Sequence, residues 1–391
     1  MIAKLRLLFV SQRPLFPVRF SHGGQRSNHE LLLALSERGI FECVALGHAD
    51  QSYHEAYAPK TADYDALSIR NYILGESFAT YDCGYKATIN FDEDAHMQLV
   101  RETMNSFSPD VVVTGQRGFL SIISAISGYR NSIFVSLDTL PGQGVYSIDD
   151  LNFINSSRAR ALTCSEYLKK VVEPYIPGKC SIVYPSFGSV HPRPNRSERK
   201  SIGVINPIPA KGGEIIKQLS ELFPDEQFLL LEGWEVSAKF SLDTSNLFRN
   251  CANVRWCSRT AQIGDFLSQL KLLLVPSQWD EAFGRIAFEA QIFHVPVIAS
   301  QVGGLPEAVG NAGVFVSDFK EIAAWEYVLR DVLFPDDKLR AIHSRMDIRL
   351  QDPPFSPECT VSQFLAALLD DPSTTKETAL ALAHWLPLLP R

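Results

Sequence analysis

The sequence lacks the features that define several large classes of protein. Its seven cysteines are scattered over 391 residues without a C-x-x-C pair, which argues against a disulfide framework or a structural zinc site. No apolar run approaches the roughly 18 residues that a membrane-spanning helix needs. Basic residues are not in excess, because 37 Lys and Arg stand against 44 Asp and Glu, for a formal charge of −7. We therefore expect no nucleic-acid partner.

Several short motifs are also missing. The chain has no G-x-G-x-x-G fingerprint, so a dinucleotide cofactor is not expected. No histidines have the H-E-x-x-H spacing of a zinc peptidase, and we predict neither a metal site nor a cofactor. Short-period repeats and low-complexity stretches are absent too, which argues against a fibrous or disordered chain.

The composition that remains is that of an ordinary globular protein. Hydrophobic residues make up 46% and charged residues 21% of the chain, which supplies ample material for a core. A length of 391 residues predicts two domains. The apolar stretch near the N-terminus is too short for a signal peptide and predicts a first buried strand. Together with the scattered cysteines, this predicts a reduced, cytoplasmic protein.

Short apolar runs alternate with longer amphipathic segments along the whole chain. Continuous apolar strands that alternate with helices are typical of parallel sheets covered on both faces, so we predict two doubly wound, Rossmann-like α/β domains. In the first half the runs lie at 5–10, 42–47, 110–115, 132–137, 161–165 and 181–185. In the second half they lie at 201–207, 227–233, 253–258, 270–277, 295–301 and 312–316.

The domain boundaries follow from breaks in this rhythm. We predict an N-terminal domain at 1–187, a linker at 188–200, a C-terminal domain at 201–353, and a helix with a tail at 354–391. The linker segment contains two prolines and three arginines without apolar periodicity, which is typical of a connection between domains. Residues 51–107 are rich in tyrosine with little strand pattern, and we predict an irregular lid or partner-facing insert there.

Parallel sheets bind ligands at the carboxyl ends of their strands. Two such domains that face each other would therefore form a ligand-binding site in the cleft between them. This expectation depends on the pattern of strands and helices alone.

Residues 275–316 contain the most informative motif. The strand that ends at Ser277 leads through a short loop into Glu281-Ala282-Phe283-Gly284, and a helix is predicted from Arg285. A glycine at the start of a helix lets a phosphate approach the backbone N–H groups, where the helix dipole also favours negative charge. Glu289 lies along the same helix and, like Glu281, can accept hydroxyls of a sugar or ribose. A second helix start follows at Gly303-Gly304.

The pattern E-x-F-G-x-x-x-x-E-A, followed by P-V-I-A-S-x-x-G-G-x-P-E, resembles the retaining GT-B glycosyltransferases of the glycogen-synthase-like superfamily, specifically family 4. The likeness extends more weakly to Gly23-Gly24, to Thr163-Cys164-Ser165 and to Lys211-Gly212. It implies an acceptor-binding first domain and a second domain that binds a nucleoside-diphosphate sugar. It also implies that the C-terminal segment crosses back to the first domain.

The resemblance assigns roles to individual residues. Glu281 matches the glutamate that contacts hydroxyls of the donor sugar, and Glu289 matches the one that holds the ribose. The backbone at Gly284 and Arg285 would bind the diphosphate, with Lys211 as counter-charge. The residues that we predict to act in catalysis are Glu281, Lys211 and Arg285. The predicted donor-binding residues are Gly23, Gly24, Asn206, Lys211, Phe283, Gly284, Arg285 and Glu289. On the acceptor side we include His22, Gln116 and Arg117.

Two positions depart from the family pattern. The family arginine after the first strand of the second domain is replaced by Asn206, and we hypothesise that Arg285 supplies the missing cation. The histidine that many relatives carry after a P-D-V-V strand is replaced by Gln116, which can form hydrogen bonds but is neither an acid nor a base at neutral pH. Asp92-Glu93-Asp94 has the form of the D-x-D metal motif of the other glycosyltransferase fold, but without its context we predict a solvated acidic turn.

The reaction that the resemblance implies is transfer of a hexosyl unit to an acceptor hydroxyl with retention of anomeric configuration. In such enzymes a donor phosphate oxygen helps to take the acceptor's proton, so neither a protein base nor a metal is required. The acceptor is left open among a small molecule, a glycan and a lipid-linked molecule, and the last would entail peripheral membrane contact. Two alternatives stay open: a non-catalytic sugar-nucleotide-binding protein and a sugar-nucleotide epimerase.

Overall fold

The computed structural model describes residues 4–12, 22–64, 68–190, 199–233, 244–334 and 336–385. The chain divides into two compact units. Unit 1 comprises Met1–Ser189 with Phe355–Arg391, and unit 2 comprises Val190–Pro354. Residues 191–198 of the predicted linker and 386–391 of the predicted tail lie outside the described residues.

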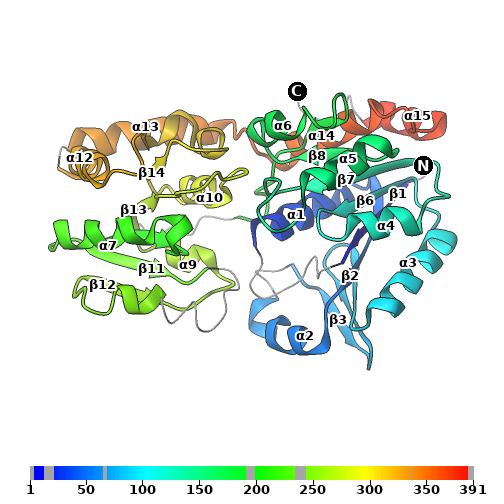
Figure 1. The fold of residues 1–391 in the computed structure, drawn as a ribbon, viewed down its shortest axis with the longest axis horizontal. Helices are drawn as coiled ribbons and strands as arrows, with labels where there is room; N and C mark the ends of the chain where they lie inside the picture. Colours follow the sequence, from blue (N-terminus) through cyan, green and yellow to red (C-terminus); the bar gives the residue numbers. More distant parts are fainter. Residues whose placement is uncertain are drawn as a thin grey trace. The chain divides into compact units, whose positions relative to one another are not determined.

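Unit 1 is built on a nine-stranded sheet with the order β3-β4-β5-β2-β1-β6-β7-β8-β9. Several strands of this sheet, from β3 to β8, are labelled in Figure 1. Its strands are β1 (Leu5–Ser11), β2 (Phe41–His48), β3 (Asn71–Leu74), β4 (Phe78–Asp82), β5 (Lys86–Asn90), β6 (Val111–Gly115), β7 (Ser132–Leu137), β8 (Arg160–Thr163) and β9 (Cys180–Ile182). Its helices are α1 (Gly23–Glu37), α2 (Gln51–Tyr57), α3 (Glu93–Phe107), α4 (Phe119–Ala125), α5 (Ile148–Ser156), α6 (Glu166–Val172), α14 (Pro357–Leu369) and α15 (Lys376–Trp385).

The prediction of an irregular insert at 51–107 is wrong. This segment contains α2, the strands β3 to β5 and the helix α3, and β4 pairs antiparallel with both β3 and β5. The reason lies in the kind of strand. An antiparallel edge with one face in solvent does not show the continuous apolar run of a strand buried on both faces, and β3 has mostly exposed side chains.

The C-terminal segment packs on unit 1. Helix α14 contacts α1, and its Phe364 belongs to the same buried core as the strand residues Phe41 and Phe134. The ring of Phe364 lies 6.0 Å from that of Phe41 and 6.1 Å from that of Phe134, measured between centroids. Because these buried aromatic rings contribute large apolar areas, α14 is an integral part of the core of unit 1.

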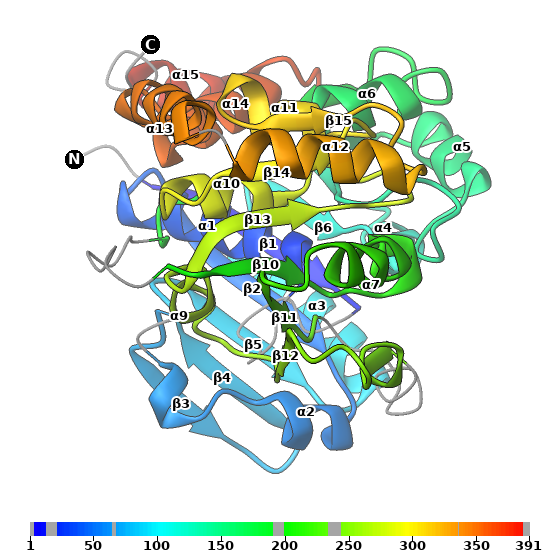
Figure 2. The same cartoon turned by 90° about the vertical axis from the view of Figure 1, so that its left-hand side faces the viewer.

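Unit 2 contains a six-stranded, wholly parallel sheet with the order β12-β11-β10-β13-β14-β15 (Figure 2). This is the strand order of the Rossmann fold. Its strands are β10 (Ser201–Ile205), β11 (Gln227–Leu231), β12 (Val254–Cys257), β13 (Leu270–Val275), β14 (Val297–Ser300) and β15 (Val314–Val316). Its helices are α7 (Gly213–Leu222), α9 (Ile263–Leu267), α10 (Arg285–Ile292), α11 (Leu305–Val309), α12 (Ile322–Leu333) and α13 (Asp336–Gln351).

The helices of unit 2 cover both faces of its sheet. One core joins alternate residues of β10, β11 and β13 to α7, α12 and α13, with the buried Trp325 of α12 among its largest side chains. Helix α10 contacts β13 and β14 but contributes no residue to that core. The predicted class of two doubly wound α/β domains is therefore confirmed, with one antiparallel strand in unit 1, while the cleft between the units stays a prediction.

Candidate active site

The predicted donor residues of unit 2 gather where its chain topology reverses. The connection after β10 leads to β11 on one side, and the connection after β13 leads to β14 on the other, although β10 and β13 are neighbours. Ligands of open α/β sheets bind at such a switch point. The two loops are joined directly, because the backbone N–H of Gln278 donates to the carbonyl of Ala210 at 2.9 Å.

Lys211 and Glu281 form an ion pair across these two loops. The ammonium of Lys211 donates to Oε1 of Glu281, and the side chains are only 16% and 12% exposed. The same oxygen accepts from the hydroxyl of Ser277 and, at 3.4 Å, from the indole N–H of Trp279. The ammonium also lies 5.1 Å from the centroid of the Trp279 ring, a cation–π contact.

This arrangement keeps Glu281 ionised. Burial alone would raise the pKa of its carboxyl, but the charge of Lys211 and the hydrogen bonds from Lys211, Ser277 and Trp279 outweigh it, so the pKa lies below its ordinary value. Oε1 accepts all of these hydrogen bonds. The second oxygen, Oε2, accepts none from the residues that the structure describes. A negative oxygen is thus available to a ligand hydroxyl.

Gly284 precedes helix α10 as its N-terminal capping residue, in a conformation that suits glycine. Its φ of 94° is in the left-handed region, and a Cβ there would lie 2.4 Å from Cδ2 of Leu305. The Gly303-Gly304 turn packs on the neighbouring backbone: the N–H of Gly304 donates to the carbonyl of Glu281 at 2.7 Å. A Cβ on Gly304 would lie 2.4 Å from the carbonyl oxygen of Ala282. Both glycine positions therefore fix the loop that carries Glu281.

Arg285 and Glu289 pair with each other on α10. Their side chains approach to 3.2 Å and are 7% and 13% exposed. The guanidinium of Arg285 therefore points along its own helix to the glutamate that was predicted to hold the ribose. Phe283 is buried just before the helix. The structure brings Arg285, Glu289 and Gly284 together at the start of α10, with Glu281 in the preceding loop.

Asn206 occupies the position after β10 in a strained conformation. Its φ is 55°, which is uncommon for a residue other than glycine. The residue is buried, and its side-chain amide nitrogen has no hydrogen-bond partner among the described residues. A Cβ on Gly233 would lie 2.3 Å from Cβ of Asn206, so the end of β11 needs glycine to accommodate this side chain.

Gln116, the predicted acceptor-side residue of unit 1, connects the ends of two strands. Its Oε1 accepts from the backbone N–H groups of Asp138 at 2.9 Å and Thr139 at 3.1 Å, and its Nε2 donates to Oδ1 of Asp138. Burial raises the pKa of the Asp138 carboxyl to about 7, although the hydrogen bond from Gln116 lowers it in part. Arg117 lies half-buried in the turn that follows, before α4.

His22 and Gly24 lie at the start of α1. The ring of His22 caps the helix, since its Nδ1 accepts from the N–H of Gln25 at 3.4 Å. Gly23 is the first residue of the helix. A Cβ on Gly24 would lie 1.3 Å from Oδ2 of Asp138. The absence of a side chain at Gly24 therefore makes room for this carboxyl group. The Gly23-Gly24 motif alone does not reveal this reason for the glycine.

Sequence reasoning missed three side chains: Asp138, Ser277 and Trp279. Asp138 directly follows the apolar run 132–137, where the end of a parallel strand calls for ligand-binding residues, so a signal for it was present. Ser277 and Trp279 contact Glu281 because their loop folds back on itself, and the sequence does not reveal this loop conformation. Among the described residues, no His, Cys, Asp and Glu side chains gather in a group that could hold a metal ion. Within the same ranges, no helix has the length and apolarity to span a bilayer.

Part of the chain is similar in sequence to known proteins. Residues 215–344 match the family model described as glycosyl transferases group 1. The D-inositol 3-phosphate glycosyltransferase of Mycolicibacterium vanbaalenii is 33% identical over 152 residues, which is 34% of this chain and 33% of that protein. The protein of the same name from Streptomyces avermitilis is 42% identical over 87 residues, or 22% of this chain and 18% of that protein. The chain thus matches a third or less of the length of these relatives.

Comparison with solved structures covers nearly the whole chain. Anabaena HepE in complex with UDP and glucose has a TM-score of 0.72 at 15% identity, over 93% of this chain and 99% of that one. Sucrose-phosphate synthase from Thermosynechococcus elongatus has a TM-score of 0.69 at 15% identity, over 92% of this chain and 97% of that one. By fold the chain is a GT-B protein, and by sequence its residues 215–344 match the group 1 glycosyltransferases. Membership in family 4 stays a prediction.

Proposed function

We propose that the protein transfers a hexosyl unit from a nucleoside-diphosphate sugar to an acceptor hydroxyl, with retention of anomeric configuration and without a metal ion or cofactor. The observation that carries the proposal is the buried Lys211–Glu281 pair beside Gly284, at the switch point of the unit 2 sheet. The matched family segment supports it, since it includes Glu281 and Glu289.

The donor diphosphate binds at the start of α10. Backbone N–H groups at Gly284 and Arg285 and the positive end of the helix dipole attract phosphate. Lys211 supplies a full charge from the neighbouring loop. As the bond to the sugar breaks, negative charge grows on the departing nucleoside diphosphate, and these groups offset it. No bound metal is needed for that charge, because a side-chain cation and the helix start provide the compensation.

Glu281 holds the sugar and Glu289 the ribose. Oε2 of Glu281 accepts a donor hydroxyl, while Oε1 stays bound to Lys211, Ser277 and Trp279. Glu289 accepts a ribose hydroxyl and keeps its pairing with Arg285, whose charge also favours the nearby diphosphate. Unit 1 binds the acceptor, a small molecule, glycan or lipid-linked molecule, in the cytoplasm. Retention follows if the acceptor attacks on the face from which the diphosphate leaves.

The two alternatives are distinguished by what is made. The enzyme is incubated with UDP-glucose, GDP-mannose, ADP-glucose or TDP-glucose and a panel of sugar and polyol acceptors, and products are followed by NMR. The proposal predicts a new glycoside whose anomeric coupling matches that of the donor. A glycoside of opposite configuration contradicts retention. Bound but unchanged donor indicates the non-catalytic protein, and an isomerised free nucleotide sugar indicates the epimerase. Addition of EDTA should leave the rate unchanged.

The replacement of the family arginine has a separate test. If Arg285 supplies the cation that Asn206 cannot, Arg285→Ala should weaken nucleoside-diphosphate binding about as much as Lys211→Ala, by roughly tenfold or more. Calorimetric titration with the nucleoside diphosphate that the wild type binds measures the affinity of both variants. An unchanged affinity in Arg285→Ala assigns this residue to the pairing with Glu289 alone.

A further inference from the structure

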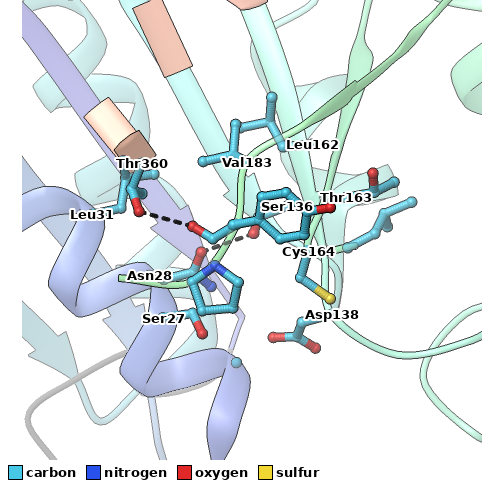
Figure 3. Close-up of a pocket in the computed structure, with 14 residues that line it drawn as sticks. Ser27, Asn28, Leu31, Ser136, Asp138, Leu162, Thr163, Cys164, Val183 and Thr360 are labelled. Carbon is cyan, nitrogen blue, oxygen red and sulfur yellow. Dashed lines mark hydrogen bonds between the residues drawn. The ribbon is translucent and has the colours of Figure 1, made fainter. Parts of the chain in front are cut away.

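Unit 1 contains a small cavity beside helix α1, at the carboxyl ends of β7 and β8 (Figure 3). Its volume of about 30 Å³ is enough for one water-sized group. The polar side chains that line it include Asn28 from α1 and Asp138 from the end of β7. Unlike the loops of unit 2, none of the described residues around it is basic.

Asn28 presents a hydrogen-bond donor to this cavity. The residue is 7% exposed, and its Oδ1 accepts from the hydroxyl of Ser136 at 2.8 Å (Figure 3). This bond fixes the amide group, so that Nδ2 is the remaining donor. Among the described residues Nδ2 has no hydrogen-bond partner. A nearly buried amide donor that the protein leaves unused indicates a ligand atom that accepts from it.

Asp138 presents an acceptor to the same cavity. Its Oδ1 is held by Gln116, and its Oδ2 lies over Gly24, where any side chain would overlap it. Oδ2 accepts no hydrogen bond from the described part of the chain. Burial raises the pKa of this carboxyl to about 7, because its charged form lacks the solvation that water or a donor would supply. A donor that entered the cavity would relieve that cost.

We infer that this cavity receives one hydroxyl group of an uncharged polyol acceptor, which accepts a hydrogen bond from Asn28 and donates one to Asp138. The inference rests on the proposed glycosyl transfer and names the class of its acceptor. A hydroxyl is the small group that both accepts and donates, and it fits a space of about 30 Å³. Asp138 acts here by binding the acceptor in its ionised form.

The charges at the cavity select against an anionic acceptor. A phosphate at this place would meet the carboxyl of Asp138 without a basic side chain from the described lining, and like charges at short range repel. The partly matched relatives are named for an anionic substrate, D-inositol 3-phosphate. We therefore expect this chain to prefer the unphosphorylated polyol over its phosphate.

The test compares neutral and phosphorylated acceptors in the full-length protein. Wild type, Asp138→Asn and the control Asp149→Asn are assayed with the nucleotide sugar that the wild type hydrolyses or binds. Acceptors are myo-inositol, glycerol and methyl α-D-glucoside, against D-inositol 3-phosphate. Asp149 is an exposed acid in the first turn of α5, so its variant removes the same charge from unit 1 away from the cavity.

We expect kcat/KM for the best neutral polyol to exceed that for the phosphate by about tenfold or more, and to fall by about tenfold or more in Asp138→Asn. Donor hydrolysis, nucleotide binding and use of the polyol should not change in the control Asp149→Asn. The wild-type rate should fall as the pH drops below about 7, and the variant should lose this dependence.

Three results would overturn the inference: equal use of the polyol by wild type and Asp138→Asn, preference for the phosphorylated acceptor, or no reaction with any neutral polyol. Each leaves the glycosyltransferase proposal intact as long as the nucleotide sugar binds and is turned over. If no nucleotide sugar binds to the wild type, the proposed function itself is wrong.

Discussion

Each unit places a carboxyl group after the carboxyl end of one of its strands, Glu281 in the loop after β13 and Asp138 directly after β7, but the two groups have opposite surroundings. In unit 2, Glu281 shares its site with Lys211, and its pKa lies below the ordinary value. In unit 1, Asp138 has an amide partner, Gln116, instead of a cation, and its pKa is raised to about 7. Both groups follow strands of an α/β sheet, so the difference in pKa comes from their neighbours: a cation for Glu281 and an amide for Asp138.

This contrast separates two kinds of ligand. A site that already pairs a cation with an anion suits a ligand with both phosphates and hydroxyls, since the cation binds phosphate and the carboxylate accepts hydroxyls. A site with a carboxyl and an amide suits a neutral hydroxyl. Substitutions that add or remove one charge at either site should therefore have unequal effects.

The largest effect is expected for Lys211→Ala. This change removes the counter-charge for the diphosphate and leaves Glu281 buried with hydrogen bonds from Ser277 and Trp279 alone. We expect kcat to fall by about 10²- to 10³-fold, as for the loss of one group that stabilises developing charge. Initial rates of nucleoside-diphosphate release measure it. A decrease of less than fivefold would show that Lys211 is an ordinary turn residue.

Gly24→Ala should have the next largest effect, on stability. The added methyl would overlap Oδ2 of Asp138, and overpacking of this kind costs about 1–3 kcal/mol. The double variant with Asp138→Ala should recover most of the loss, because the overlapping group is gone. Urea denaturation of the four proteins gives the coupling free energy. Additive losses would show that Gly24 is required for another reason, such as the approach of a phosphate.

The stability of unit 1 should depend on pH through Asp138. Its pKa rises from 3.8 in the unfolded chain to about 7 in the folded one, so between these values the folded state keeps a proton that the unfolded state has lost. Its contribution to stability therefore declines as the pH rises through this window. Between pH 4.5 and 7.5, Asp138→Asn should show a smaller decline in unfolding free energy than the wild type. Parallel curves would contradict the raised pKa.

The smallest effect is expected at Trp279. Trp279→Phe keeps an aromatic face for the ammonium of Lys211 but removes the 3.4 Å hydrogen bond to Glu281. We expect a two- to fivefold loss of donor affinity, roughly what a weak hydrogen bond contributes. Trp279→Ala should lose several-fold more, because the cation–π contact disappears as well. Equal affinities in the two variants would show that the ring does not position Lys211.

The sequence predicted the unit 2 site better than the unit 1 site for a physical reason. Glu281, Gly284 and Glu289 belong to one loop and one helix, so their spacing is a local property. Lys211 comes from a second loop, but the fixed strand order of the fold places it nearby. By contrast, Asp138 and Gln116 meet only because β6 and β7 are neighbours in the sheet. Their pairing is tertiary, and no spacing in the sequence encodes it.

The fold, too, was predicted where the signal is local in the sequence and missed where it depends on tertiary pairing. Strands with a continuous apolar run are visible in the sequence, whereas β3 is mostly exposed, β4 alternates between exposed and covered positions, and the buried β5 contains Thr88 and Asn90. The segment therefore lacks the apolar pattern of a parallel core strand, although β5 pairs parallel with β2 and only the β4 pairs are antiparallel. The ion pair between Arg285 and Glu289 has the i, i+4 spacing of helical neighbours, a signal that the diphosphate hypothesis overlooked.

The central claim is that unit 2 binds a nucleoside diphosphate at the Lys211–Glu281 pair and the start of α10. The most direct test is a thermal-shift titration of wild type, Lys211→Ala and Glu289→Ala with UDP, GDP, ADP and TDP. A ligand at 100 times its Kd stabilises the folded state by about 2.7 kcal/mol, which moves the midpoint by several degrees. We predict that one diphosphate shifts the wild type and neither variant. No shift in the wild type, or equal shifts in all three proteins, would contradict the account.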